Sequence, residues 1–218
     1  MILLDRLTKI FHMGNARKVV VDNATVTFPS RTSIALLGRN GAGKSTLLRI
    51  IAGTVEPTSG QVLARGTISY PVGFSGSFHR DLTGAQNAKF VARIYGVDTD
   101  ALLDYVADFA ELGAHFHQPI HTYSSGMRSR LAFGISMGIP FDTYLVDEVT
   151  SVGDASFRNK SQQVFAERMQ KSGMLFVSHS LPQVKEICQA GVVLEKGKLT
   201  YYDNVEEAIA HHSRNMTG

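Results

Sequence analysis

The segment GRNGAGKS, residues 38–45, constrains the fold of this chain more than any other feature. It follows the apolar run SIALL at 33–37 and leads into KSTLLRIIA at 44–52, whose apolar spacing predicts a helix. Glycines in the pattern G-x-x-x-x-G-K-[ST] let the backbone curl, so that successive N–H groups point at phosphate oxygens beside the positive end of the helix. The sequence therefore predicts a strand, a phosphate-binding loop and a helix.

The side chains of this loop have separate expected tasks. Lys44 is expected to reach the β- and γ-phosphates of a nucleotide, and the hydroxyl of Ser45 is expected to hold Mg²⁺. The loop residues predicted to contact the nucleotide are Gly38, Asn40, Gly41, Ala42, Gly43, Lys44, Ser45 and Thr46. The alternative is a glycine-rich turn that matches the pattern by accident, and the strand before it and the helix after it argue against that reading.

A second candidate is the segment TYLVDE, residues 143–148, an apolar strand that ends in two carboxylates. Ligands gather at the carboxyl ends of the strands in a parallel sheet, where the phosphate loop also lies. Asp147 is then placed to hold Mg²⁺ through its water shell, and Glu148, facing the other way, to activate an attacking water. Solvated charge at a strand end is the alternative.

The order of elements along the chain predicts an α/β fold with a mainly parallel sheet. Strands are expected at 2–7, 19–28, 33–37, 61–64, 67–72, 144–147, 174–178 and 192–195, and helices at 44–52, 84–95, 101–112, 125–138 and 181–190, with another between the strands at 144–147 and 174–178. We therefore expect one domain over 1–218, with an α/β core at 1–83 and 140–218 and a helical insertion at about 84–139.

Composition excludes several classes of protein. A hydrophobic fraction of 44% and a charged fraction of 19% are ordinary for a globular chain and argue against disorder. The apolar run at 131–141 is shorter than the roughly 20 residues that span a bilayer, and Asp5 and Arg6 interrupt any signal peptide. A single cysteine, Cys188, cannot form an internal disulfide, so we expect the protein in a reducing compartment. We expect its side chain to be a small buried apolar group. The net charge of +3 does not require a nucleic-acid partner, and we expect none.

Three further motifs identify a family by their order. YSSGM at 123–127 opens a predicted helix shortly before the acidic strand, SVGD follows at 151–154, and VSHS lies at 177–180. By itself the first is only a serine that caps a helix. Together the sequence resembles the ATPases of ABC transporters, which implies that the signature residues Ser124, Ser125 and Gly126, with Asp154 in the D-loop, contact ATP, and that His179 is the switch histidine.

The resemblance can be narrowed to one group. GRNGAGKST, YSSGMRSRL and DEVTSVGD together are similar to the ATPase subunits that export polysaccharides, most of all to the capsular-polysaccharide group. O-antigen and teichoic-acid exporters are the alternatives within the family. Several O-antigen relatives carry an additional carbohydrate-binding domain, and a chain of 218 residues is expected to have no room for one, which favours capsule export.

This resemblance implies a composite site and a set of partners. Two copies are expected to pack head to tail with ATP and Mg²⁺ between them, so that the phosphate loop of one faces the Ser124 helix start of the other. Two copies of a separate transmembrane permease would couple this closure to movement of a lipid-linked polysaccharide. The expected location is the cytoplasmic face of the inner membrane.

Four positions leave alternatives open. His79 falls where the family has a glutamine that contacts Mg²⁺ and water, and it is either a functional replacement or a plain exposed histidine. Phe11 falls where the family stacks an aromatic ring on adenine, and the alternative is a core phenylalanine at a strand end. His179 contacts the γ-phosphate or is an ordinary strand-end histidine. Phe74 and Phe78 form part of a socket for the membrane subunit or belong to the core.

Other readings of the chain are weaker. His115, His117 and His121 suggest a metal site, but no cysteine or acidic cluster accompanies them, so a solvated loop is expected. An ATPase that remodels nucleic acid or ribosomes would need a coiled-coil insertion or two ATPase halves. A P-loop kinase would need an arginine-bearing lid and would have no use for the signature segment or His179.

Overall fold

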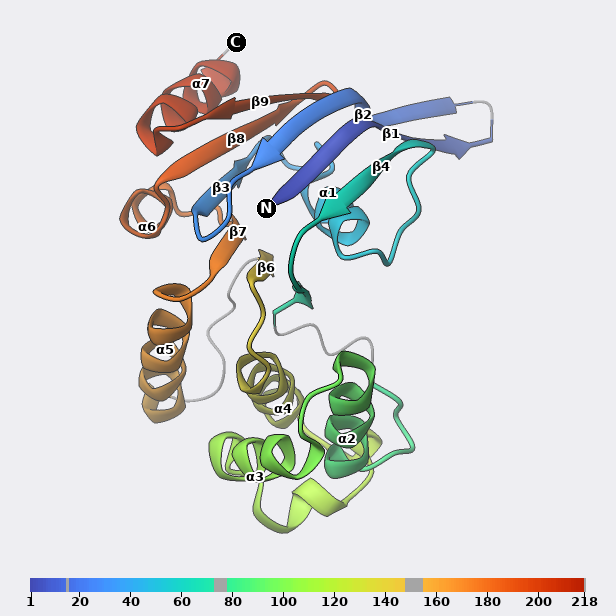
Figure 1. Ribbon diagram of the computed structural model, residues 1–218, viewed down its shortest axis with the longest axis vertical. Coiled ribbons are helices and arrows are strands. Elements are labelled where there is room, and N and C mark those ends of the chain that lie inside the picture. The colour runs from blue at the N-terminus through green and yellow to red at the C-terminus, as the bar shows by residue number, and fades with distance from the viewer. Residues whose placement is uncertain (15, 73–77, 148–154, 218) are drawn as a thin grey trace. The chain divides into compact units, whose positions relative to one another are not determined.

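The structure is a computed structural model that describes residues 1–14, 16–72, 78–147 and 155–217 (Figure 1). The described residues form two compact units. The first contains those of 1–71, 141–148 and 171–218, and the second contains those of 72–140 and 149–170. Glu148 and Asp154, both predicted site residues, lie outside the described ranges.

The larger sheet of the first unit has six strands in the order β5-β6-β7-β3-β8-β9. They are β3 (Ser33–Leu37), β5 (Ile68–Pro71), β6 (Thr143–Asp147), β7 (Gly173–Val177), β8 (Ala190–Glu195) and β9 (Lys198–Tyr202). Neighbouring strands are parallel, except that β9 runs antiparallel to β8. Every residue of β3 and β7 is buried, as expected for strands covered on both faces. The predicted α/β fold with a mainly parallel sheet is confirmed.

A second, antiparallel sheet of three strands lies in the same unit, in the order β2-β1-β4 (Figure 1). Its strands are β1 (Ile2–Met13), β2 (Ala16–Phe28) and β4 (Ser59–Ala64). One apolar core joins the two sheets, because Leu4, Val21 and Phe28 of the smaller sheet pack in the same cluster as Leu145 and Leu175 of the larger one. The smaller sheet is therefore anchored to the larger through side chains that leave water together.

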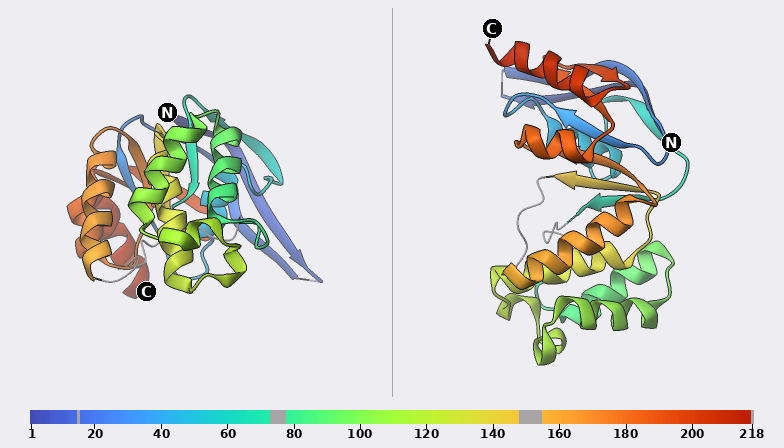
Figure 2. Two further views of the ribbon diagram at one scale, coloured as in Figure 1. Left: turned by 90° about the horizontal axis from the view of Figure 1, so that it is seen from below. Right: turned by 90° about the vertical axis from the view of Figure 1, so that its left-hand side faces the viewer.

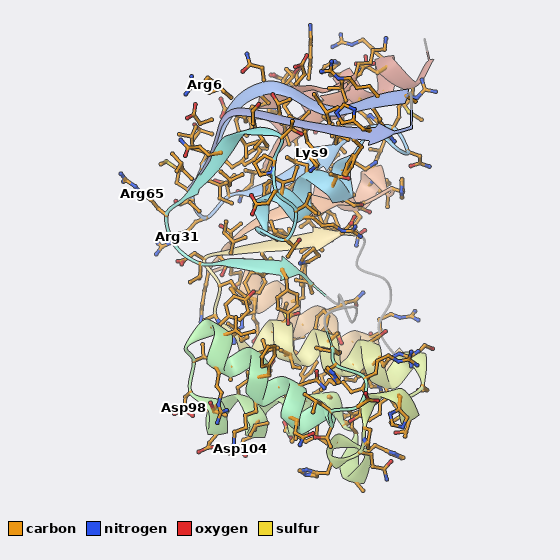
Figure 3. The ribbon with its side chains drawn as sticks, turned by 90° about the vertical axis from the view of Figure 1, so that its right-hand side faces the viewer. Arg6, Lys9, Arg31, Arg65, Asp98 and Asp104 are labelled. Atoms are coloured by element: carbon orange, nitrogen blue, oxygen red, sulfur yellow. The ribbon has the colours of Figure 1, made fainter. Side chains whose placement is uncertain are left out.

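Helices complete the first unit. They are α1 (Lys44–Ile51), α6 (Leu181–Ile187) and α7 (Val205–Thr217). Figure 1 shows α7 beside β8 and β9, and Gly191 of β8 lies so close to it that a Cβ there would meet the Ala208 Cβ at 2.4 Å. Figure 3 shows Arg6, Arg31 and Arg65 projecting outward from this unit.

The second unit is helical (Figure 2). It contains α2 (Gly84–Tyr95), α3 (Thr99–Ala110), α4 (Ser125–Gly138), α5 (Ala155–Met169) and two short 3₁₀ segments, Gly113–His117 and Ile120–Thr122. Phe109 of α3 is central: its ring stacks on Phe133 of α4 at 5.8 Å and meets Phe157 of α5 edge-on at 5.2 Å. Three helices therefore share one aromatic core. Asp98 and Asp104 project from this unit in Figure 3.

The division of the chain differs from the expected one. The sequence predicted a helical insertion at 84–139 and placed the rest in the core, whereas residues 78–83 and helix α5 belong to the second unit. The reason for α5 is its contacts. In addition to Phe157, Lys160 Nζ lies 2.8 Å from Glu111 Oε1, and Arg168 Nε donates to the Met137 carbonyl at 2.9 Å.

The sequence analysis did not predict β9 and α7, and it expected a helix between the strands at 144–147 and 174–178, where α5 lies, without giving its bounds. The sequence of α7, VEEAIAHHSRNM, is largely polar, so its apolar spacing alone only weakly predicts a helix. β1 and β2 are also longer than expected, since both extend to the turn near Gly14. Among the helices of the described ranges, none has the length and apolarity that crossing a membrane requires.

Leu36 tests the packing beneath the phosphate loop. It is 1% exposed on β3, so Leu36→Ala should lower the free energy of unfolding by about 2–5 kcal/mol. The matched control is Leu63→Ala on β4, where the side chain is 47% exposed and the loss should stay below about 1 kcal/mol. Urea denaturation followed by circular dichroism measures both, and equal losses would mean that β3 does not lie in the core.

Cys188 tests the packing at the end of α6. Its side chain is 5% exposed, and burial raises the pKa of the thiol to about 12. The thiolate is the reactive form, so iodoacetamide should alkylate the native protein about a thousandfold more slowly than the urea-unfolded protein at the same pH. Mass spectrometry reads the labelling, with Cys188→Ser as the unlabelled control. Rapid labelling of the native chain would contradict the buried position.

Candidate functional site

The loop between β3 and α1 is held by close approaches at two glycines. A Cβ at Gly43, where φ is +111°, would lie 2.2 Å from Val20 Cγ1 of β2. A Cβ at Gly38 would lie 2.5 Å from the Leu194 carbonyl oxygen of β8. Neither position has room for a side chain, so the glycines of the pattern bring the loop backbone against both sheets.

Lys44, the first residue of α1, lies along the loop. Its Nζ donates to the Gly38 carbonyl at 2.7 Å and to the Arg39 carbonyl at 3.3 Å. The helix begins without a side-chain cap and without an acidic residue in its first turn. Its N-terminal N–H groups and the lysine therefore present positive charge at one place, which suits an anion.

A pocket of about 380 Å³ opens at this loop, within the first unit. It is lined by Phe11, Lys18, Val20, Asn40, Gly41, Gly43, Lys44, Ser45, Thr46, Asp147, Val177 and His179. Predicted residues from three motifs, together with Phe11, are thus brought to one pocket. Gly38 and Ala42 are in the loop without lining this pocket. The sequence analysis missed Lys18 and Val20, which belong to no motif, and it assigned no role to Val177 of the VSHS segment.

Asp147 reaches the pocket from the carboxyl end of β6. In the parallel ladder it is paired with Val177 of β7, and both line the pocket. The Asp147 carboxylate and the hydroxyl of Ser45 are hard oxygen donors, the type that Mg²⁺ prefers together with substrate phosphates. Among the described residues, no group of three or more histidine, cysteine, aspartate or glutamate side chains could hold a metal ion. The donor set therefore fits a magnesium ion that takes its other ligands from phosphate and water.

Phe11 of β1 and His179, which follows β7, also line the pocket. The Phe11 ring is 38% exposed, so it is not a core side chain, and Lys9 Nζ lies 4.8 Å from its centroid. His179 follows β7 and is exposed next to the cap of α6, where the Ser180 Oγ accepts from the Gln183 N–H. An aromatic ring and an imidazole thus face the same pocket as the phosphate loop.

Helix α7 supports the loop from outside the pocket. Arg39 Nη1 donates to the Asn215 carbonyl at 3.4 Å, and the Asn215 amide donates to the Glu195 carboxylate at the end of β8. Burial, followed by the nearby Lys44 ammonium, lowers the pKa of His212 on the same helix. The last helix of the first unit is therefore in contact with the residues that shape the loop.

The start of α4, in the second unit, is a well-formed helix terminus. Ser124 is the N-cap, and its Oγ accepts from the Met127 N–H at 3.2 Å. No acidic residue occupies the first turn, and Arg128 donates to the Tyr123 carbonyl at 2.8 Å. A Cβ at Gly126 would find only Ser124 Oγ, at 3.9 Å, so the space around it is open. This terminus could receive an anion.

His79 lies in the second unit, before α2, and its side chain is exposed. The buried Asn87 fixes the backbone here: its Oδ1 accepts from the His79 N–H at 2.9 Å, and its Nδ2 donates to the His79 carbonyl at 3.2 Å. Sequence reasoning missed Asn87 because one asparagine in a helix carries no motif. Phe78 is 8% exposed, which favours its core reading, while Phe74 lies outside the described residues.

The three loop histidines serve local contacts. His115 Nδ1 lies 3.0 Å from Gln118 Oε1, and His121 Nδ1 lies 3.7 Å from Asp81 Oδ1. Both side chains are exposed, as is that of His117. The three exposed histidines thus lie in the two 3₁₀ segments, where the sequence predicted a loop.

Known proteins resemble the chain over almost its whole length. Residues 21–151 match the ABC transporter family. A polysialic acid transport ATP-binding protein, KpsT, of Escherichia coli is 48% identical over 219 residues, covering 99% of this chain and 100% of that protein. A capsule polysaccharide export ATP-binding protein, CtrD, of Neisseria meningitidis serogroup B is 38% identical over 213 residues, covering 98% and 99%.

Solved structures agree on the fold. An ATP-binding cassette, in a dimeric post-hydrolysis state with ADP and Pi, has a TM-score of 0.75 at 20% identity, covering 91% of this chain and 96% of that chain. An ATP-binding subunit of an ABC transporter has a TM-score of 0.73 at 18% identity, covering 98% and 99%. The likeness of fold, together with the match over residues 21–151, confirms the resemblance in the sequence. The chain belongs to the ABC transporter family, as one of its ATP-binding cassettes.

Proposed function

We propose that this protein is the ATP-hydrolysing subunit of an exporter that moves a lipid-linked capsular polysaccharide across the inner membrane. The observation that carries the proposal is the 48% identity to a polysialic acid transport ATP-binding protein, over 99% of this chain and all of that protein. O-antigen and teichoic-acid export proteins are less similar, at 33% and 35% identity in two examples. Those exporters remain the runner-up within the family.

The proposed pocket binds ATP by its two ends. Phe11 supplies an aromatic face for adenine, and Lys44, with the N–H groups of the loop and of α1, binds the β- and γ-phosphates. Ser45 and Asp147 would hold Mg²⁺, which supplies charge neutralisation at the phosphates when bound. Thr46 and Asn40 complete the wall beside the phosphates.

The hydrolytic step needs a base and a contact to the γ-phosphate. We assign the base to Glu148, which follows Asp147 at the end of β6, and the γ-phosphate contact to His179. His79 would add one polar contact, since a neutral imidazole presents a single acceptor.

We further propose that two copies pair head to tail. The Ser124 N-cap, with Ser125 and Gly126 in the first turn of α4, would face the γ-phosphate held by the other copy, because the N–H groups that the cap leaves unpaired at a helix start attract anions. Asp154 would lie in the same interface. The pair would dock on two copies of a membrane permease at the cytoplasmic face.

Lys44 is the direct test of nucleotide binding. Lys44→Ala removes the ammonium that faces the phosphates, so the affinity for MgATP should fall by about tenfold or more, as when a charge-assisted hydrogen bond is lost. Isothermal titration calorimetry measures it, with Lys171→Ala, an exposed lysine of the same unit, as control. Unchanged affinity in the Lys44 variant would place the phosphates elsewhere.

Glu148 is the test of hydrolysis and pairing. Glu148→Gln should retain ATP binding and lower turnover by about 10² or more, as for a lost general base. Light scattering of this variant should then show a dimer only with MgATP, and adding Ser124→Arg should abolish the dimer, since the long side chain fills the helix start. Normal turnover would move the base to another residue, and a dimer that survives Ser124→Arg would contradict the composite site.

The export role itself is tested in the host cell. Deleting the gene should leave lipid-linked polysaccharide inside the cell, because the permease has lost its source of energy. Wild-type protein should restore the polymer at the surface, and Glu148→Gln, which binds the permease without turnover, should not. Normal surface polymer in the deletion strain would exclude this substrate and favour a different one.

A further inference from the structure

Lys18 of β2 is a second cation in the nucleotide pocket, and no motif of the family points to it. Its side chain is exposed and lines the pocket together with Phe11, Lys44 and Asp147. With the residues that the structure describes, its ammonium makes neither a hydrogen bond nor an ion pair. It differs in this from Lys44, which donates to the Gly38 and Arg39 carbonyls.

The strand register places Lys18 at the Phe11 end of the pocket. Phe11 and Lys18 are directly paired in the antiparallel ladder of β1 and β2, so their side chains share one face of the sheet. Val20, two residues along the strand, also lines the pocket and packs against Gly43 of the phosphate loop. Lys18 therefore lies about 7 Å along the strand from the contact with the loop, toward the aromatic ring.

The two neighbouring basic side chains, Lys9 and Arg17, do not offer their charge to the pocket. Lys9, which Figure 3 shows on β1, donates to the Glu56 carbonyl at 2.6 Å and lies over the Phe11 ring at 4.8 Å. It does not line the pocket. Arg17 is paired with His12, so it lies on the opposite face of the sheet from Lys18. Of these three side chains, only Lys18 offers an uncommitted charge to the pocket.

We propose that Lys18 pairs with the α-phosphate of the bound nucleotide. The base lies at Phe11 and the outer phosphates lie at Lys44, so the α-phosphate, which is joined to the nucleoside, is the phosphate nearest to the hairpin. An ammonium on a flexible four-carbon stem suits this contact as a point charge. The pocket then holds the phosphate chain from both ends. This inference rests on the proposed binding of ATP.

The test compares nucleotides that differ in phosphate number. Lys18→Met keeps the apolar stem and removes the charge. By isothermal titration calorimetry it should weaken ATP, ADP and AMP each by about three- to tenfold, because all three carry the α-phosphate, and should leave adenosine unchanged. Lys44→Ala should weaken ATP and ADP but not AMP. The effect of Lys18→Met should shrink in high salt, since the side chain is exposed.

Arg17→Met is the matched control, because it removes an equal charge from the adjacent residue on the other face. It should bind all four ligands as the wild type does. Equal affinities for Lys18→Met and wild type would overturn the inference. So would a loss confined to ATP and ADP, which would place Lys18 at the outer phosphates, or a loss that includes adenosine, which would place it at the nucleoside. Folded wild-type protein that fails to bind ATP would instead overturn the proposed function.

Discussion

The packing of Gly43 against Val20 is the contact on which the site depends. It joins the phosphate loop, which leaves the parallel sheet, to the antiparallel hairpin, and it leaves no room for a Cβ at that position. On the other side, Gly38 rests against the Leu194 carbonyl of β8. These two close contacts fix the backbone of the loop where it enters α1. Lys44 then lies along the loop and donates to the Gly38 and Arg39 carbonyls. Positive charge is thus concentrated by backbone geometry more than by the number of basic residues.

The chemistry of the chain is divided between its two units. The pocket lies in the first unit, whereas the Ser124 helix start and the loop at His79 lie in the second. The helix start is held by the local Ser124 cap, and the loop is held by Asn87, which hydrogen-bonds the backbone of His79 and the Leu82 carbonyl. The proposed head-to-tail pair would use both units as they are, because pairing would then add contacts without refolding the pocket or the helix start.

Much of the fold and the site could be predicted from the sequence because the signals were local. The strand, loop and helix at 33–51 need only glycines at fixed spacing, and β6 and β7 read as apolar runs with a polar end. What was missed depends on pairing across the chain. Helix α5 has a polar sequence and joins the second unit through Phe157 and Lys160, and α7 is recognisable only once β8 is beside it. Lys18 and Val20 enter the pocket by strand register, which no single segment encodes.

The register of β1 and β2 places Phe11 opposite Lys18. Residues on a strand alternate between faces, so a shift of the hairpin by one position would move Phe11 and Lys18 together to the far side of the sheet. The ladder of β1 and β2 changes register in several places before Ile10 and is regular beyond it. Val20 lies at the last of these shifts, between the partners of Lys9 and Ile10, and is 2% exposed against Gly43. The contact of Val20 with the phosphate loop therefore lies next to the paired residues Phe11 and Lys18, and a substitution at Val20 would disturb the loop and this end of the pocket together.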